Sequence, residues 1–224
     1  MTRSLIPVAL AAALTFSLIC STAIRHGHAD VPIAASADQV QPLGVGDPAP
    51  RFVVAAVDSS PVEFDPQNLD KPVMLLVFRG GWCPYCNMYL SEMRHVIPEI
   101  QSLGIDVLFL SGDRPELLYE SLESEAQEDI AGLDYTLLSD ADAQASMALG
   151  IAFKAPQRAI DYVKKKGDGY TKSSMDRHGV LPVPAVFAIG RDGVIAFTFV
   201  NPDYKVRLPA DELLAAARAI AAAD

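Results

Sequence analysis

A six-residue apolar run from Val73 to Phe78 constrains the fold of this chain more than any other sequence feature. Such a run is expected of a strand that is buried on both faces of a parallel sheet. Gly80-Gly81 ends the run, and from Pro84 onward the apolar residues recur at helical spacing. Pro84 suits the first helical turn, where its missing N–H costs nothing. The segment therefore predicts a buried strand, a tight turn and a helix in direct succession.

The rest of the body repeats this alternation of strands and helices. Strands are predicted over residues 52–57, 62–64, 105–110, 135–138, 185–189 and 194–199, and further helices over 113–128, 143–149 and 209–223. Asp113 is a good N-cap, with Pro115 and Glu116 in a capping-box pattern, and Pro98 should kink or divide the helix that starts at Pro84. This order predicts an α/β fold with a mixed central sheet and helices on both faces.

The first 29 residues differ from the body. Arg3 precedes an apolar stretch from Leu5 to Ile24, and Gly27-His28-Ala29 fits a signal-peptidase site, so we expect a signal peptide cleaved before Asp30. The alternatives are an uncleaved anchor, because 20 residues can just span a bilayer, and a lipoprotein site at Cys20. The prediction is an exported protein of the periplasm or cell envelope, on the membrane only if this segment is retained.

Three further segments follow. Residues 30–44 have the composition of a short flexible linker, and residues 45–224 should form one domain. Within it, residues 152–180 are polar, basic and irregular, which predicts a surface excursion. The run Lys164–Lys166 there is interpreted as a solvated face rather than a contact for an acidic partner.

The net charge of the chain is −10. Nucleic acid requires a basic face, so nucleic acid is excluded as a partner. Docking on anionic lipid is disfavoured for the same reason.

Cys83 and Cys86 are the only thiols outside the first 29 residues. Both fall in the first turn of the predicted helix, where unpaired N–H groups and the macrodipole stabilise a thiolate. A disulfide between them would close a small ring and stabilise the fold by only about 2 kcal/mol, so a redox pair is favoured over a structural disulfide. A zinc site would need His95 and His178 at a spacing that fits no common pattern. We expect no metal and no cofactor.

Two neighbours of the pair have alternative interpretations. Arg79 could place positive charge near a thiolate, but at a strand end it is more often part of a surface ion pair. Trp82 could be a platform for a partner or could simply cap the core. Tyr204 and His178 are interpreted as a packing residue and a solvated loop residue.

The stretch from Phe78 to Asn87 resembles the peroxiredoxin-like branch of the alkyl hydroperoxide reductase/thiol-specific antioxidant family, which has the thioredoxin fold. Gly46 to Phe52, Leu138-Ser139-Asp140, Val183 to Phe187 and Asp192-Gly193 resemble further landmarks of that family. The resemblance implies a hydroperoxide or disulfide substrate and a dithiol reductant such as a thioredoxin-like protein. The rival functions are a cell-envelope disulfide reductase and a redox-silent binding module.

Two departures from the family pattern affect the assignment of roles. Cys83 stands where the family has a Thr or Ser, and Pro184 stands where it has an Arg. Pro184 resembles the proline of thioredoxins, so we expect a cis bond after Val183, beside the pair. The family resemblance favours Cys86 as the attacking thiol, with Cys83 resolving the sulfenic acid. The thioredoxin pattern reverses these roles, and helix geometry favours Cys83 as the more accessible thiol.

Overall fold

The computed structural model describes residues 33–120, 127–128, 136–165 and 173–223. The strands are β1 (Phe52–Ala55), β2 (Pro61–Phe64), β3 (Val73–Phe78), β4 (Asp106–Ser111), β5 (Thr136–Ser139), β6 (Ala152–Lys154), β7 (Val180–Pro182), β8 (Ala185–Ile189) and β9 (Ile195–Val200). The α-helices are α1 (Pro84–Met93), α2 (Ile97–Ser102), α4 (Gln144–Ala148), α5 (Gln157–Lys165), α6 (Ser174–His178) and α7 (Ala210–Ala223). Short 3₁₀ turns cover Ala37–Gln39, Pro66–Asn68 and Pro115–Leu117.

The described residues form a seven-stranded mixed sheet in the order β2-β1-β5-β4-β3-β8-β9. Strands β3, β4 and β5 are parallel, and β8 runs antiparallel to β3. The ends of β3 and β4 that carry Phe78 and Ser111 therefore meet at one edge of the sheet, which is where ligands bind in open α/β sheets.

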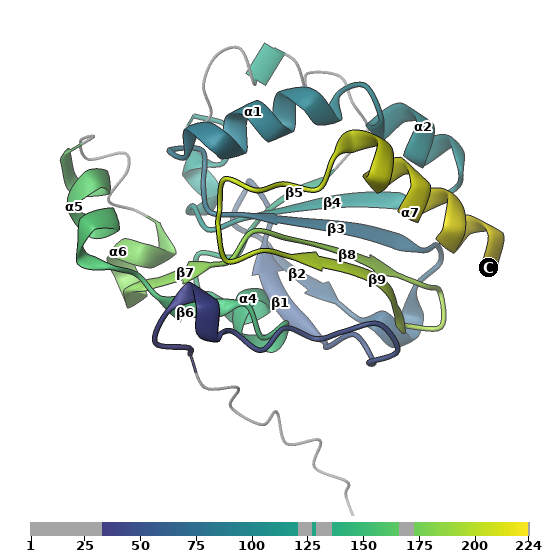
Figure 1. Ribbon diagram of the computed structural model, residues 1–224, viewed down its shortest axis with the longest axis horizontal. Helices are drawn as coiled ribbons and strands as arrows, with labels where there is room; N and C mark the ends of the chain where they lie inside the picture. Colours follow the sequence, from purple (N-terminus) through teal and green to yellow (C-terminus); the bar gives the residue numbers. More distant parts are fainter. Residues whose placement is uncertain (1–32, 121–126, 129–135, 166–172, 224) are drawn as a thin grey trace, which may run out of the picture.

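Helices cover both faces of this sheet. In Figure 1, α1, α2 and α7 lie along one face, while α4 lies on the other side beside β1. The break between α1 and α2 places Pro98 in the first turn of α2, so Pro98 divides the helix as expected. The predicted thioredoxin-like α/β class is confirmed.

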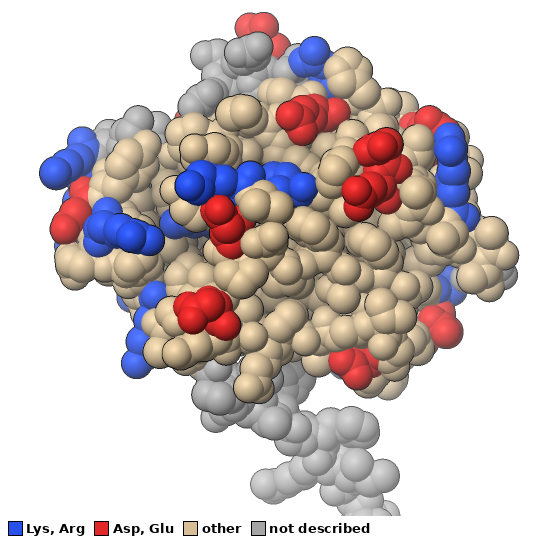
Figure 2. Space-filling model, in the orientation of Figure 1, with Lys and Arg blue, Asp and Glu red and all other residues tan. Residues whose placement is uncertain are grey.

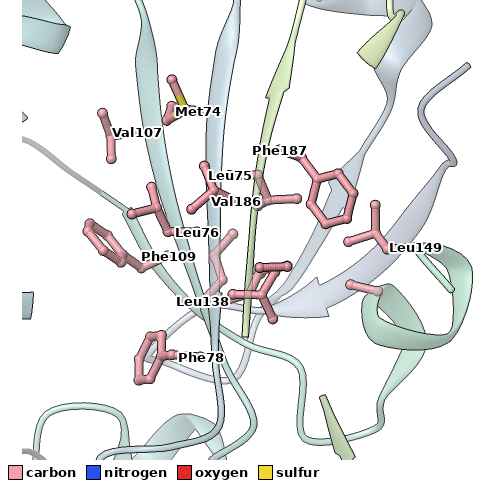
Figure 3. Close-up of a cluster of buried hydrophobic side chains, with 14 of the residues drawn as sticks. Met74, Leu75, Leu76, Phe78, Val107, Phe109, Leu138, Leu149, Val186 and Phe187 are labelled. Carbon is pink, nitrogen blue, oxygen red and sulfur yellow. The ribbon is translucent and has the colours of Figure 1, made fainter. Parts of the chain in front are cut away.

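The core is centred on β3, of which all six residues are buried. Figure 3 shows Met74, Leu75 and Leu76 of β3 among Phe109 and Phe187 from the two neighbouring strands. A strand with apolar contacts on both faces cannot accommodate a polar side chain without a cost, and this explains the uninterrupted apolar run in the sequence. The core thus holds rigid the strand end from which the Cys pair starts.

Residues 33–44, expected to be a flexible linker, are instead part of the domain. Ala34 N–H donates to Ala152 O at 3.1 Å, and Leu43 N–H donates to Leu149 O at 3.1 Å. Ala37, Val40 and Leu43 pack against the core. The prediction of a flexible linker was wrong. It was based on composition, and composition does not show that the folded domain offers a surface on which these small and apolar residues pack.

The excursion at 152–180 contains more regular structure than we expected. Strands β6 and β7 pair antiparallel, and α5 buries Ala159 and Val163 against the domain. In Figure 1 this unit lies at the end of the sheet where α1 begins. Residues 166–172, including Lys166, lie outside the described residues, whereas Lys164 and Lys165 are exposed.

The helix predicted from Asp113 is only partly described. A 3₁₀ turn begins at Pro115 with Arg114 as its N-cap. The Asp113 carboxylate accepts a hydrogen bond from Gly81 N–H at 2.7 Å. Asp113 is therefore not the cap we predicted, because the turn before α1 takes its side chain. Residues 121–126 of the predicted helix lie outside the described part.

The predicted signal peptide and its cleavage site before Asp30 also lie outside the described residues. Within the described ranges, no helix is both long and apolar enough to cross a membrane. Figure 2 shows acidic and basic side chains interspersed over one face, so charge alone singles out no binding surface there.

Candidate functional site

The turn between β3 and α1 is held by hydrogen bonds to its backbone. Gly80 has φ +143°, and a Cβ there would overlap Trp82 Nε1 and lie 2.7 Å from Asp113 Oδ1. Asp113 accepts from Gly81 N–H, and the Asn87 side chain donates to Gly81 O at 2.6 Å. Only glycine combines this backbone conformation with so close an approach. The turn therefore places the next residues, Trp82 and Cys83, at a defined position.

Cys83 and Cys86 lie in the first turn of α1, as predicted. Cys83 is the N-cap, and its carbonyl accepts from Cys86 N–H at 2.9 Å. Both are free thiols and both are buried. A hydrogen bond from the Cys86 thiol, together with the charge of Arg79, lowers the pKa of Cys83 to about 6. Burial raises the pKa of Cys86 well above its ordinary value, so at neutral pH the shared proton resides on Cys86.

Arg79 follows β3 directly and is buried, with 7% of its surface exposed. Its guanidinium carbon lies 4.4 Å from the ring centre of Tyr204 and 5.0 Å from that of Trp82. Among the described residues it forms no ion pair, and its Nε has no hydrogen-bond partner. The prediction that Arg79 belongs to a surface ion pair is therefore wrong. A buried cation without a carboxylate partner favours a nearby anion.

Trp82 and Tyr204 both pack against other side chains and line the site. Trp82 is buried, and its ring lies 6.4 Å from that of Tyr162 of α5. Tyr204, interpreted as a packing residue, packs on Arg79 and also contacts the Tyr85 ring at 5.6 Å. Both Trp82 and Tyr204 line the pocket described below, so neither residue is limited to the core.

Arg207 is a site residue that sequence reasoning missed. Its Nη2 donates to Cys86 Sγ at 3.3 Å from the loop between β9 and α7. The two residues are 121 positions apart in the sequence, and nothing near Arg207 in the sequence marks it as a partner of a thiol. The positive charge of Arg207 favours the ionised form of Cys86, and the charges of Arg79 and Arg207 both favour that of Cys83.

A pocket of about 440 Å³ opens beside Cys83. Its walls are mainly aromatic and proline side chains from the α1 turn, the β6–α5 unit and the loops before β8 and after β9: Trp82, Tyr85, Phe153, Pro156, Tyr162, Pro182, Pro184, Pro202 and Tyr204. Arg79 and Arg158 are its cationic lining residues, and Cys83 lines it whereas Cys86 does not. The pocket can hold an organic molecule with one end against the Cys83 sulfur.

Pro184 lies in this pocket wall, but the peptide bond before it is trans, since the described residues contain no cis peptide bond. The expected cis bond is therefore wrong. The trans form is the default for X–Pro by about 0.5–1 kcal/mol. Val183 N–H donates to Ile151 O at 2.9 Å. The backbone here is already paired within the chain.

The histidines considered for a zinc site lie elsewhere. His95 accepts from Arg94, and His178 of α6 lies 3.4 Å from Asp142. Within the described ranges no group of three or more His, Cys, Asp or Glu residues could hold a metal ion. The reactive and charged groups that the described residues bring together at the site are the two sulfurs and the guanidiniums of Arg79 and Arg207.

The chain is similar in sequence to known proteins. The sequence model of the AhpC/TSA family matches residues 45–198. Peroxiredoxin Bcp of Escherichia coli strain K12 is 31% identical over 115 residues, which is 50% of this chain and 67% of that protein. The thiol-disulfide oxidoreductase ResA of Bacillus thuringiensis is 21% identical over 166 residues, 74% of this chain and 75% of the relative.

Solved structures give the same fold. Peroxidoxin BcpB from Mycobacterium tuberculosis superposes with a TM-score of 0.54 at 19% identity, covering 80% of this chain and 98% of that one. Reduced Prx3 from Vibrio vulnificus, solved in complex with H₂O₂, has a TM-score of 0.58 at 17% identity and covers 78% and 99%.

Proposed function

Because the chain belongs to the AhpC/TSA family and is a peroxiredoxin-like thiol oxidoreductase, we propose that it reduces organic hydroperoxides with Cys83 as the attacking thiol and Cys86 as the resolving thiol. This assignment differs from the one that the family resemblance favoured. It agrees with the helix geometry, which favoured Cys83 as the more accessible thiol, and it rests on the surroundings of the two sulfurs in the fold.

The observation that carries the proposal is the unequal position of the two sulfurs. Cys83 borders the pocket, and the pKa of its thiol is lowered to about 6. Cys86 lies behind it, does not line the pocket and keeps its proton because burial raises its pKa. Since the thiolate is the reactive form, the sulfur that is both ionised and next to the pocket is the one that meets a substrate.

The reaction balances with the two sulfurs of the pair and one proton from water, which the departing alkoxide takes up. The Cys83 thiolate attacks the terminal peroxide oxygen, the O–O bond breaks, and Cys83 becomes a sulfenic acid while the alkoxide takes a proton to leave as an alcohol. The Cys86 sulfur then attacks the Cys83 sulfur, and hydroxide leaves as water with the Cys86 proton. The product is the Cys83–Cys86 disulfide. Arg79, within the pocket, is placed to stabilise the negative charge of the thiolate and of the departing oxygen.

The pocket supports a substrate with an apolar organic body. Its walls are mostly aromatic and proline side chains, which a compact, strongly hydrated peroxide does not fill. We therefore expect alkyl or aryl hydroperoxides to react faster than hydrogen peroxide. An external dithiol, such as a thioredoxin-like protein, would then reduce the disulfide by exchange.

Two single variants test the assignment, both in a Cys20→Ser background so that no third thiol interferes. Cys86→Ser keeps the attacking thiol and should consume one equivalent of cumene hydroperoxide, stopping at a sulfenic acid that dimedone traps on Cys83. Cys83→Ser should react about as slowly as an unactivated cysteine. The opposite result, with dimedone on Cys86 and a slow Cys86→Ser, would restore the roles implied by the family resemblance.

A disulfide oxidoreductase is the second candidate, favoured by the likeness to ResA. The trans bond before Pro184 removes the thioredoxin-like feature that the sequence predicted for this candidate. Reduction of insulin by the same protein sample decides between the two functions. A turnover with insulin faster than that with any hydroperoxide would favour the second candidate.

Export is a separate proposal, based on the apolar stretch from Leu5 to Ile24 and on Gly27-His28-Ala29. N-terminal sequencing of the protein from its host should find Asp30 first. An intact Met1 or Thr2 in a cytosolic fraction would contradict export.

A further inference from the structure

Cys86 faces a difficulty in the proposed reaction. It must lose its proton to attack the sulfenic acid on Cys83, yet it lies fully inside the protein, where burial disfavours a thiolate. In the reduced state its thiol hydrogen is donated to the Cys83 thiolate. Oxidation of Cys83 removes that anion, so another group has to favour the ionised form of Cys86.

Of the groups that act on Cys86, one is a cationic side chain in contact with its sulfur. Cys83 is the neighbour that becomes oxidised, and the Tyr89 side chain is neutral because burial raises its pKa far above neutral pH. The Arg79 guanidinium lies between Trp82 and Tyr204 on the pocket side of the turn. The Arg79 backbone also forms a hydrogen bond that lowers the pKa of Cys86, but that backbone group carries no net charge. Arg207 is the cation in contact with the sulfur, at 3.3 Å from Nη2 to Sγ.

The environment of Arg207 is suited to this contact. Its guanidinium carbon lies 5.9 Å from the centre of the Tyr89 ring, so the aromatic face helps to fix its orientation. Its Nη1 is buried and has no hydrogen-bond partner in the described part of the chain. Arg207 as a whole is half-buried. A guanidinium with an unpartnered, buried nitrogen can bind a full thiolate more strongly than it binds a neutral thiol.

We propose that Arg207 is the positioning residue for the second chemical step: it stabilises the Cys86 thiolate once Cys83 is a sulfenic acid and so drives disulfide closure. This rests on the proposed function. It assigns to a residue in the β9–α7 loop a task that is separate from the attack on peroxide. The Cys86 proton leaves with the hydroxide of the sulfenic acid as water, and the S–S bond forms as the S–O bond breaks.

The first measurement does not involve peroxide. In a Cys20→Ser, Cys83→Ser background, Cys86 is the remaining thiol, and absorbance at 240 nm against pH reports its ionisation. Arg207→Met should shift this titration to higher pH, and Arg207→Lys should recover part of the shift. Lys205→Met is the matched control, because it removes an exposed charge from the same loop. If the Arg207→Met variant and the protein that keeps Arg207 gave the same titration curve for Cys86, the proposal would be overturned.

The second measurement follows the two steps by Trp82 fluorescence in stopped flow, in the Cys20→Ser protein with cumene hydroperoxide. Arg207→Met should slow the concentration-independent closing phase at least tenfold and leave the peroxide-dependent phase within about threefold. Dimedone should then trap the sulfenic acid on Cys83 in larger yield. A variant that closes at the normal rate, or slows only in the peroxide-dependent phase, would show that Arg207 does not serve Cys86.

The two failures can be told apart. If the unmutated protein shows no peroxide-dependent phase, the proposed function fails, while the 240 nm titration still tests the contact of Arg207 with Cys86. If the phase appears and the variant closes normally, the function stands and the role of Arg207 fails. Circular dichroism of Arg207→Met and Arg207→Lys ensures that only folded variants are compared.

Discussion

At the scale of single residues, the two cysteines differ although they share one helical turn. Cys83 is the N-cap and borders a pocket, whereas Cys86 is one turn further in and has protein on every side. A hydrogen bond between them places the negative charge on Cys83. The difference in reactivity therefore comes from depth in the protein and not from the chemistry of the residue type.

The rate of Cys83 oxidation should depend on pH in a defined direction. The thiolate reacts and its pKa is about 6, so the rate of peroxide consumption should rise as pH increases through about 6 and level off above it. Removal of the donor by Cys86→Ala should move this rise to higher pH, whereas Cys86→Ser keeps a donor and should move it less. Single-turnover rates from pH 4.5 to 9 measure both. If the rate of the unmutated protein rose only near pH 8.5, the result would contradict a hydrogen bond from Cys86 that lowers the pKa of Cys83.

Arg79 should contribute to the same ionisation. Arg79→Met keeps an apolar stem between Trp82 and Tyr204 but removes the charge, so the pKa of Cys83 should rise and the peroxide rate at pH 6 should fall by about threefold to tenfold. Arg158→Met removes another pocket charge that does not act on the Cys83 sulfur. An equal effect of both variants on the pKa of Cys83 would mean that general pocket charge, not the position of Arg79, is responsible.

At the scale of secondary-structure elements, the turn between β3 and α1 depends on Gly80. A Cβ there meets Trp82 and Asp113, and φ is +143°. Gly80→Ala should therefore lower the free energy of unfolding by about 3 kcal/mol and alter Trp82 fluorescence. Gly104 also has positive φ but an open surrounding, so Gly104→Ala should cost only about 1–2 kcal/mol. Urea unfolding compares the two, and equal losses would argue against the close approach at Gly80.

The start of α4 depends on Asp140. Its buried carboxylate accepts from Ala145 N–H and Ser146 N–H at 2.9 Å each, and from the Ser146 hydroxyl. Asp140→Ala leaves these donors unpaired and should cost about 2–3 kcal/mol in urea unfolding. The nearby Asp142 is exposed and pairs with Arg177 on the surface, so Asp142→Ala should cost less than about 1 kcal/mol. Comparable losses in the two variants would contradict this capping role.

At the scale of the whole molecule, segments far apart in sequence build one site. The pocket takes its walls from residue 37, from the α1 turn, from the β6–α5 unit and from the loop that carries Tyr204. The segment at 33–44 belongs to this assembly, because Ala37 lines the pocket and Leu43 is hydrogen-bonded to Leu149.

Removal of that segment should weaken the domain. A chain that begins at Gly44 loses the packed side chains of Ala37, Val40 and Leu43 that a chain beginning at Ile33 retains. We expect a decrease in unfolding free energy of at least about 2 kcal/mol, from the apolar area re-exposed to water. Thermal and urea unfolding of the two chains measure it. Equal stability would mean that the segment is the linker that its composition suggested.

Outside residues 152–180, where β6, α5, α6 and β7 were not predicted, the sequence by itself determined most of the order of strands and helices. The periods of apolar residues and the positions of Pro84, Pro98 and Gly80-Gly81 depend only on local backbone and burial. The sequence also determined that Cys83 and Cys86 share the first turn of a helix, because a motif of four residues is local. Helix geometry already favoured Cys83 as the more accessible thiol. The tertiary structure alone decided that a pocket lies beside it and that Arg207 contacts Cys86 across 121 positions. It also decided that Arg79 is buried, that Pro184 is trans and that residues 33–44 pack on the domain. These features arise from contacts between segments that are distant in sequence. The free energies of such contacts depend on distance, burial and orientation in space, and a linear pattern of residue types does not specify these quantities.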